Sequence, residues 1–181
     1  VKNFKIENIF YYWYGVKKKT QIIEKQRNKK ESINYISAEF KKIEKPNDKI
    51  LFDIANFYKN SKEYTKAIEF YTRLIEKIDN EPEIVSDLLY RRGGCFERIG
   101  EYEKADNDLS NSLKIEPDDA YVLNYLAYSW LERDYKIEEA IKMLEKAYSI
   151  KENDPYIIDS IGWAYYLIKD YIKAENFLRR A

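Results

Sequence analysis

The chain has 181 residues; 35% of them are charged, and 32 Lys and Arg residues balance 32 Asp and Glu residues. This balance leaves no net charge to steer the whole chain to nucleic acid or to a membrane surface. Histidine is absent, which removes the commonest general base, the Ser-His-Asp and Cys-His nucleophiles and nearly all catalytic zinc sites. The composition therefore predicts a protein that is not an enzyme and that uses no cofactor, metal or small-molecule substrate.

Charge is distributed unevenly along the sequence. Residues 1–49 contain 13 Lys and Arg against 6 Asp and Glu, so the remainder is acidic, with 19 against 26. No run of 18 apolar residues exists that would span a bilayer. The single cysteine, Cys95, excludes an internal disulfide and leaves the compartment open.

Residues 1–46 form the first predicted segment. Aromatic residues crowd the stretch 4–14, lysines follow at 17–19, and a polar tract runs over 24–32. The apolar stripe that comes next predicts a helix over 33–45; it consists of Ile33, Ile36, Phe40 and Ile43. We interpret the segment as a degenerate helical repeat. Two alternatives are an aromatic segment that docks in a groove of this chain or of a neighbour, and a basic tail that contacts anionic lipid or nucleic acid. Nucleic acid and membrane are the weaker choices, because the lysines and aromatics adjoin without alternating.

Four copies of one short phrase follow. They are Glu63-Tyr-Thr-Lys-Ala67, Glu101-Tyr-Glu-Lys-Ala105, Lys136-Ile-Glu-Glu-Ala140 and Asp170-Tyr-Ile-Lys-Ala174. Their closing alanines are separated by 38, 35 and 34 residues. A period of about 34 residues with a fixed small residue is typical of stacked helix pairs, which form quasi-one-dimensional binding scaffolds.

A second small residue stands upstream of each closing alanine, on the preceding predicted helix. These residues are Ala55, Gly93, Ala127 and Gly162. Two small residues let the backbones of a helix pair approach closely, and large apolar residues recur around them at helical spacing. Breaks between pairs are predicted at Pro82, Pro117 and Pro155. We expect a positive φ at Gly100, and helix N-caps at Asp118 and Asp154.

This pattern resembles the tetratricopeptide repeat, a helix-turn-helix unit of about 34 residues. The resemblance covers Asp48–Ala181 and implies an all-α, right-handed superhelix of four antiparallel helix pairs. The pairs are expected at about 48–82, 83–118, 119–154 and 155–181. The second pair departs from the family pattern: Arg92 occupies a usually apolar position and Ser112 replaces the usual alanine.

The stretches 121–130 and 159–166 look like bacterial repeat proteins that are often exported. The resemblance therefore slightly favours a periplasmic or exported location over a cytoplasmic one. Ala181 ends the fourth pair without a polar capping helix. We expect either further repeats after it or packing of this end on another copy.

In this family the first helix of each repeat lines a concave binding face, and the matching positions here are rich in aromatic residues. The candidate partner-binding residues are Phe52, Tyr90, Arg98, Tyr121, Asn124, Tyr128, Tyr156, Trp163 and Tyr166. Tyrosine and tryptophan dominate binding hot spots. The implied function is a non-catalytic scaffold that binds a partner peptide or protein segment on the concave face.

Three alternatives stay open. The aromatic residues can instead fill contacts between repeats. The chain can be a self-assembling module that pairs through its uncapped termini, or an adaptor that uses its basic N-terminal segment.

Other patterns that suggest chemistry are weak. Cys95 has no histidine partner, so we expect a packed structural thiol. Gly93-Gly94 lies within a predicted helix and lacks a phosphate-loop pattern. Asp106-x-Asp108 begins like a calcium loop, but Asn111 stands where glycine is needed.

Overall fold

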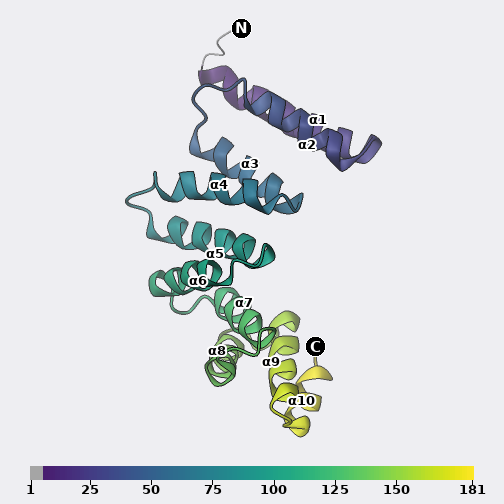
Figure 1. Ribbon diagram of the computed structural model, residues 1–181, viewed down its shortest axis with the longest axis vertical. Helices are drawn as coiled ribbons and strands as arrows, with labels where there is room; N and C mark the ends of the chain where they lie inside the picture. Colours follow the sequence, from purple (N-terminus) through teal and green to yellow (C-terminus); the bar gives the residue numbers. More distant parts are fainter. Residues whose placement is uncertain (1–5) are drawn as a thin grey trace. The chain divides into compact units, whose positions relative to one another are not determined.

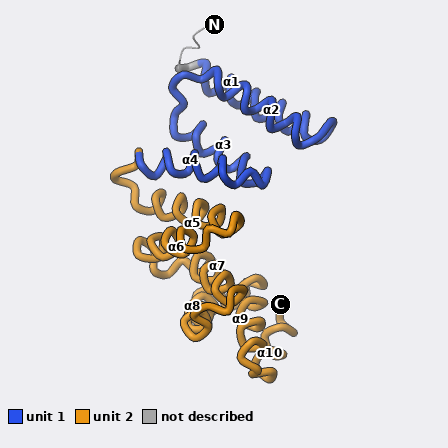
Figure 2. Tube along the Cα trace, in the orientation of Figure 1, with its two compact units in different colours: residues 1–76 blue, residues 77–181 orange. Residues whose placement is uncertain are grey.

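A computed structural model of the chain describes residues 6–181, with side chains from position 8 onward. Within this range the protein forms ten helices and no strand (Figure 1). The chain divides into two compact units, residues 1–76 and 77–181 (Figure 2). The predicted boundary after residue 46 therefore falls inside the first unit.

The first unit contains four helices. They are α1 (Ile6–Gln26), α2 (Lys29–Phe40), α3 (Asp48–Asn60) and α4 (Tyr64–Ile75). The aromatic stretch becomes part of α1, although its beginning, with Phe4, lies outside the described residues. The helix predicted over 33–45 is wrong at both ends. The helix starts at Lys29 because the Asn28 side chain accepts a hydrogen bond from the Glu31 N–H at 2.8 Å. This N-cap lies inside the polar tract 24–32, where no helix was predicted.

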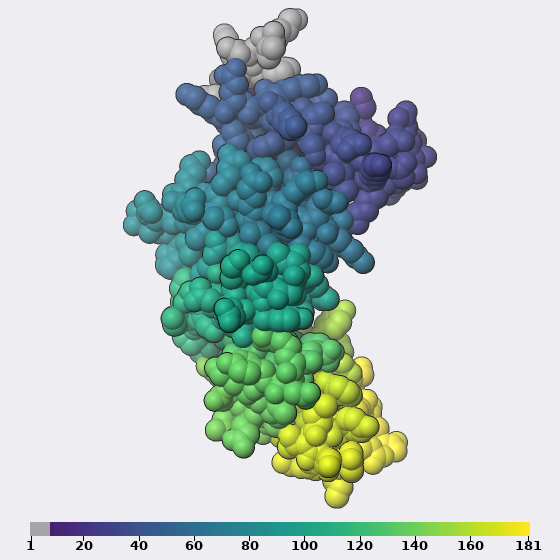
Figure 3. Space-filling model, viewed as in Figure 1, coloured from purple at the N-terminus to yellow at the C-terminus, as the bar shows by residue number. Residues whose placement is uncertain are grey.

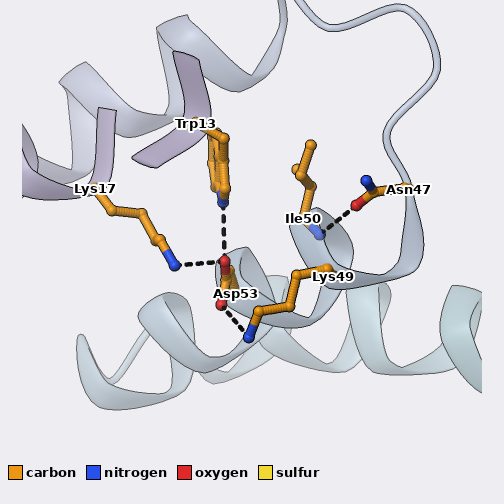
Figure 4. Close-up of polar contacts among 6 residues, drawn as sticks. All are labelled: Trp13, Lys17, Asn47, Lys49, Ile50 and Asp53. Carbon is orange, nitrogen blue, oxygen red and sulfur yellow. Dashed lines mark hydrogen bonds and ion pairs between the residues drawn. The ribbon is translucent and has the colours of Figure 1, made fainter. Parts of the chain in front are cut away.

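Helix α1 packs on α3 through one aspartate. The Asp53 carboxylate accepts hydrogen bonds from Trp13 Nε1 at 3.2 Å and Lys17 Nζ at 2.7 Å, and it pairs with Lys49 on its own helix (Figure 4). Trp13 is 3% exposed, so its ring is buried while its N–H is satisfied. Residues 6–40 thus form a helix pair that is anchored on the next pair rather than a loose tail.

The α3–α4 pair shows how the small residues work. Ala55 and Ala67 are both fully buried, and Tyr71 is buried with its hydroxyl donating to Asn56 Oδ1 at 2.7 Å. The Asn47 side chain caps α3 by accepting from the Ile50 N–H at 2.9 Å. Close approach of the two helices therefore depends on the two predicted alanines.

The second unit contains three more helix pairs, which pack against one another in the space-filling view (Figure 3). Its helices are α5 (Pro82–Arg98), α6 (Tyr102–Ile115), α7 (Ala120–Leu131), α8 (Ile137–Ile150), α9 (Pro155–Leu167) and α10 (Tyr171–Leu178). The closing alanines Ala105, Ala140 and Ala174 are at most 3% exposed. A Cβ added at Gly93 would lie 3.0 Å from Leu109 Cγ, so this glycine marks the helix contact that the sequence predicts.

Two predicted N-cap positions have different outcomes. Asp154 caps α9 by accepting from the Tyr156 and Ile157 N–H groups at 3.0 and 3.3 Å. The predicted cap at Asp118 is wrong: its neighbour Asp119 caps α7, and Asp118 pairs instead with Lys146 at 2.7 Å. Two adjacent aspartates carry the same capping chemistry, so the sequence does not distinguish them.

Both departures in the second pair are compensated by polar contacts. Arg92 forms a bidentate pair with Asp108 of α6, at 2.7 and 2.8 Å, and the Asp108 side chain is 3% exposed. The Ser112 hydroxyl lies 2.9 Å from that of Ser86 and donates to the Ser86 carbonyl at 3.0 Å. Both serines are buried. The unusual residues therefore belong to the contact between α5 and α6.

The turns inside the four helix pairs from α3 to α10 each contain a residue in the left-handed conformation. Gly100 has φ = 80°, as expected, while Lys62 and Lys169 hold the same kind of conformation with φ of 62° and 65°. The turn before α8, one residue longer, uses Asp134 and Lys136. Of these positions only Gly100 is a glycine, the residue that adopts this conformation without steric cost.

Candidate partner-binding surface

Eight of the nine predicted binding residues lie in the second unit, on the first helix of each pair. We call their surface the A-helix face; it comprises Tyr90 and Arg98 on α5, Tyr121, Asn124 and Tyr128 on α7, and Tyr156, Trp163 and Tyr166 on α9. The ninth residue, Phe52, belongs to the first unit, where it is half-buried on α3 with Lys49 Nζ 5.8 Å from its ring centre.

Helical spacing explains why α7 presents this surface. Positions 121, 124 and 128 lie along one stripe, while Val122, Leu126 and Trp130 on the other side are buried in the apolar core of the second unit. Tyr121 and Tyr128 are 46% and 39% exposed. The apolar side of α7 is therefore buried in the core, and the opposite side exposes tyrosine.

One important residue of this surface was not predicted. Tyr125 packs edge-on against Tyr90, with ring centres 5.8 Å apart, and its hydroxyl donates to the Glu97 carboxylate at 3.0 Å. Gly94 makes room for it, since a Cβ there would lie 3.4 Å from the Tyr125 hydroxyl oxygen. The signal available in the sequence was Gly94 itself, a small residue opposite a large one on the next repeat.

Burial and acidic neighbours act together on these rings. Burial, followed by the Glu97 carboxylate, raises the pKa of Tyr125 far above its usual value. The pKa of Tyr90 is raised by burial first and then by Asp119. Both rings stay neutral at physiological pH, and Tyr90 and Tyr125 are half-buried in the contact between α5 and α7.

The α9 part of the surface is more open. Trp163 and Tyr166 stack with ring centres 5.5 Å apart and planes 17° apart, and Tyr171 of α10 lies 5.7 Å beyond Tyr166. Tyr166 is 49% exposed and Tyr156 is 77% exposed. About half of the Tyr166 surface and most of the Tyr156 surface therefore face solvent.

Polar atoms on the same face lack partners among the described residues. Asn124 Oδ1 and Trp163 Nε1 are buried without a hydrogen bond. An unpaired buried polar atom costs about 1–3 kcal/mol. One of these atoms is an acceptor and the other a donor, the two functions of a peptide backbone.

A depression of about 430 Å³ lies where α5, α6 and α7 meet. It is lined by Glu97, Arg98, Tyr102, Tyr125, Tyr128, Ser129, Glu132 and Arg133. Two of the predicted residues, Arg98 and Tyr128, are thus brought together. Burial first, and then the hydrogen-bonded Glu132 carboxylate, raise the pKa of Tyr128.

The described residues offer no group of three His, Cys, Asp or Glu side chains that could hold a metal ion. The two carboxylates of the Asp106-x-Asp108 pattern, which begins like a calcium loop, form ion pairs: Asp106 with Arg133 at 2.7 Å, and Asp108 with Arg92. Cys95 is 1% exposed. None of the helices from residue 6 onward is both long and apolar enough to cross a bilayer.

Comparison with known sequences gives a consistent result. The family model described as "Tetratricopeptide repeat" matches residues 48–76 and 86–119. A curated relative, the TPR repeat-containing protein PA4667 of Pseudomonas aeruginosa, is 35% identical over 95 residues. That match covers 52% of this chain but only 16% of the relative.

Solved structures share the fold over almost the whole chain at low sequence identity. MamA from Desulfovibrio magneticus RS-1 has a TM-score of 0.70 and 18% identity, covering 93% of this chain and 92% of that one. BtubC from P. vanneervenii has a TM-score of 0.71 and 18% identity, with 91% and 76% covered. For PilF of Pseudomonas aeruginosa the TM-score is 0.66 and the identity 16%, with 92% and 73% covered.

Proposed function

We propose that this chain, whose residues 48–76 and 86–119 match the tetratricopeptide-repeat family model, is a non-catalytic scaffold that binds a segment of a partner protein. The binding site is the A-helix face of the second unit, the concave side of the repeats in this family. Tyr128, Trp163 and Tyr166 are the anchors, and Asn124 sets the register of the bound backbone.

The observation that carries the proposal is the exposure of tyrosine where packing does not require it. Tyr90 and Tyr125 show what a structural tyrosine looks like here: both are half-buried against each other. Tyr128, Tyr156 and Tyr166 differ, with 39–77% of their surface exposed. Tyrosine offers a large contact area at low conformational cost and a hydroxyl for hydrogen bonding, which is why it is enriched in binding hot spots.

The charge of the surface limits the kind of partner. Glu97 and Asp159 stand on α5 and α9, Glu132 follows the last residue of α7, and Arg98 is the cation predicted to lie among them. Asp87 of α5 is already paired with Arg91 at 2.7 Å. A recognition site for a carboxylate would need converging cations, but Lys49 and Lys59 belong to the first unit. The partner segment is therefore expected to carry apolar anchors and positive charge, with an affinity near micromolar, about −8 kcal/mol.

A comparison of two triple variants tests this function. The first replaces the exposed rings of the A-helix face, Tyr128, Tyr156 and Tyr166, by alanine; Trp163 is kept because it packs on the apolar core. The control replaces three equally exposed rings of α1, Phe10, Tyr11 and Tyr14. Circular dichroism establishes that both variants fold.

Proteins captured from native lysate by the wild-type chain are then identified by mass spectrometry. We expect a partner that the control variant retains and the A-helix variant loses. Equal recovery by both variants contradicts the proposal. Loss only in the α1 variant would transfer the site to the basic N-terminal segment.

A further inference from the structure

The depression between α5, α6 and α7 is built by one face of α7 and the end of α5. Tyr125, Tyr128 and Glu132, and likewise Tyr125, Ser129 and Arg133, recur at spacings of three or four residues along α7 and the turn that follows it, so they share one side. The last turn of α5 supplies Glu97 and Arg98, and Tyr102 comes from the start of α6. The volume of about 430 Å³ is within the usual range for ligand pockets and accommodates one long side chain.

The charges in the depression leave an excess of negative potential. Arg133 is neutralised by Asp106 at 2.7 Å, outside the depression. Arg98 then shares the lining with two carboxylates, Glu97, which is 3.4 Å away, and Glu132. Helices α5 and α7 also end here, and each helix C-terminus adds about half a negative charge.

Aromatic rings supply the remaining walls. Tyr102, Tyr125 and Tyr128 line the depression, and the Arg133 guanidinium already lies 4.7 Å from the centre of the Tyr102 ring. Cations are attracted to the faces of such rings. The rise in the pKa of Tyr125 and Tyr128, caused first by burial and then by Glu97 and Glu132 respectively, fits surroundings that disfavour a further negative charge.

A buried hydroxyl at the wall lacks a partner. Ser129 is 6% exposed, lines the depression, and its Oγ makes no hydrogen bond to any described residue. A donor arriving beside Ser129, after a small shift of the covering side chains, would pair this oxygen and remove its desolvation cost. This atom is independent of the carboxylates, and because a hydroxyl can accept as well as donate, it can pair with an arriving N–H donor.

We propose that this depression receives the cationic end of a lysine or arginine side chain carried by the bound partner segment. The inference rests on the proposed function and specifies part of it. Glu97 and Glu132 provide the opposite charge, the tyrosine rings surround the aliphatic stem, and Arg98 is an internal competitor that swings aside.

The test uses small probes and backbone amide NMR of the full chain. Nα-acetyl-lysine amide is titrated beside Nα-acetyl-norleucine amide, which has a similar stem without the charge, and Nα-acetyl-glutamate amide, which has the opposite charge. We expect saturable shifts at Glu97–Arg98 and 128–133 with the lysine probe only, with a Kd on the order of 1 mM. Spermidine, a free polyamine with the same ammonium chemistry, is titrated in parallel.

Two variants are expected to change the affinity for the lysine probe in opposite directions, and a third serves as a control. Glu132→Gln keeps the shape of an exposed side chain and is expected to weaken the lysine probe about fivefold. Arg98→Gln removes the competing cation and is expected to strengthen it. Glu83→Gln, the same charge change in the first turn of α5, is the control and should leave the affinity unchanged.

Equal shifts with the norleucine probe, or binding of spermidine without the lysine probe, overturn the inference. So does binding of the glutamate probe that Arg98→Gln abolishes, because the site would then recognise an anion. If the lysine probe fails while capture of a partner still depends on Tyr128, Tyr156 and Tyr166, only this inference falls and the proposed function stands.

Discussion

The α5–α6 pair and the α7–α8 pair follow the same backbone plan but are held together by different chemistry. Between α5 and α6 the contact includes the buried Arg92–Asp108 pair and the hydroxyls of Ser86 and Ser112. Between α7 and α8 the matching space is apolar, with Leu126 and Leu144 almost fully buried. A small residue on each helix is common to both pairs. Close approach at these residues therefore defines the repeat, and the rest of the contact can be apolar or polar provided that every polar group is paired.

The largest effect is expected from breaking the buried ion pair. Asp108→Ala leaves the Arg92 guanidinium, whose side chain is 17% exposed, without its bidentate partner. We expect a loss of about 3–5 kcal/mol in the free energy of unfolding, measured by urea denaturation. Replacing both partners, Arg92→Met with Asp108→Leu, should restore most of it, since an apolar contact like that of α7–α8 is then formed. A double variant as unstable as the single one would contradict this account.

Gly93 and Gly162 allow the packing at the helix contact to be compared between the α5–α6 and α9–α10 pairs. Gly93→Ala places a Cβ 3.0 Å from the fully buried Leu109 side chain and 3.3 Å from the Ala105 carbonyl oxygen, which cannot move away easily. We expect it to cost about 1–3 kcal/mol in thermal or urea unfolding.

Gly162→Ala gives an even shorter contact, 2.8 Å, with the Leu178 side chain, which is 43% exposed and can rotate. The added Cβ also lies 3.3 Å from the Leu178 backbone nitrogen, but Leu178 is the last residue of α10, where the backbone can shift more easily than inside a helix. The higher helix propensity of alanine, about 1 kcal/mol, then offsets the strain. This variant should stay within about 1 kcal/mol of the wild type. Equal losses in both variants would show that exposure of the neighbour does not decide the outcome.

A smaller effect is expected for the serine pair. Ser112→Ala removes a hydroxyl that is hydrogen-bonded to Ser86 in a buried site, and should cost about 1 kcal/mol. Replacing both serines by alanine should cost no more than the single change, because no unpaired hydroxyl remains. A double-mutant cycle in urea measures the coupling, and strictly additive losses would argue against a paired contact.

The smallest effect concerns the turns. Lys169 adopts φ = 65°, where a side chain is unfavourable, whereas Gly100 occupies the corresponding turn of the second pair. Lys169→Gly should raise the melting temperature by a few degrees, for a gain of about 0.5–1 kcal/mol. Gly100→Ala should lower stability by a similar amount. Destabilisation by Lys169→Gly would mean that the lysine side chain contributes contacts that outweigh its backbone strain.

The helix pairs were predictable because their signal is local and repeated. The alanines at 67, 105, 140 and 174 recur at nearly constant spacing, and each is buried as the pattern requires. The helix boundaries at the N-terminus were not predictable in the same way. Asn28 caps α2 within a tract of polar residues, where apolar periodicity gives no guidance.

The roles of residues such as Arg92 and Tyr125 could not be predicted from the sequence, because they depend on contacts between helices. Arg92 looks misplaced until Asp108, sixteen positions later, is seen to face it from α6. Tyr125 is not one of the positions that the family pattern assigns to the concave face; it lies between two of them, Asn124 and Tyr128. Its importance depends on Glu97 and Gly94 of the preceding helix pair.

The central claim, that the A-helix face of the second unit holds the partner, is tested most directly by hydrogen exchange. Backbone amide exchange is measured by mass spectrometry for the chain alone and with the partner recovered by capture. The account predicts new protection in α5, α7 and α9, greatest over residues 121–132 and 156–167, with α8 and the part of α6 after Tyr102 unchanged. Protection confined to α1 and α2, or to α10, would contradict it.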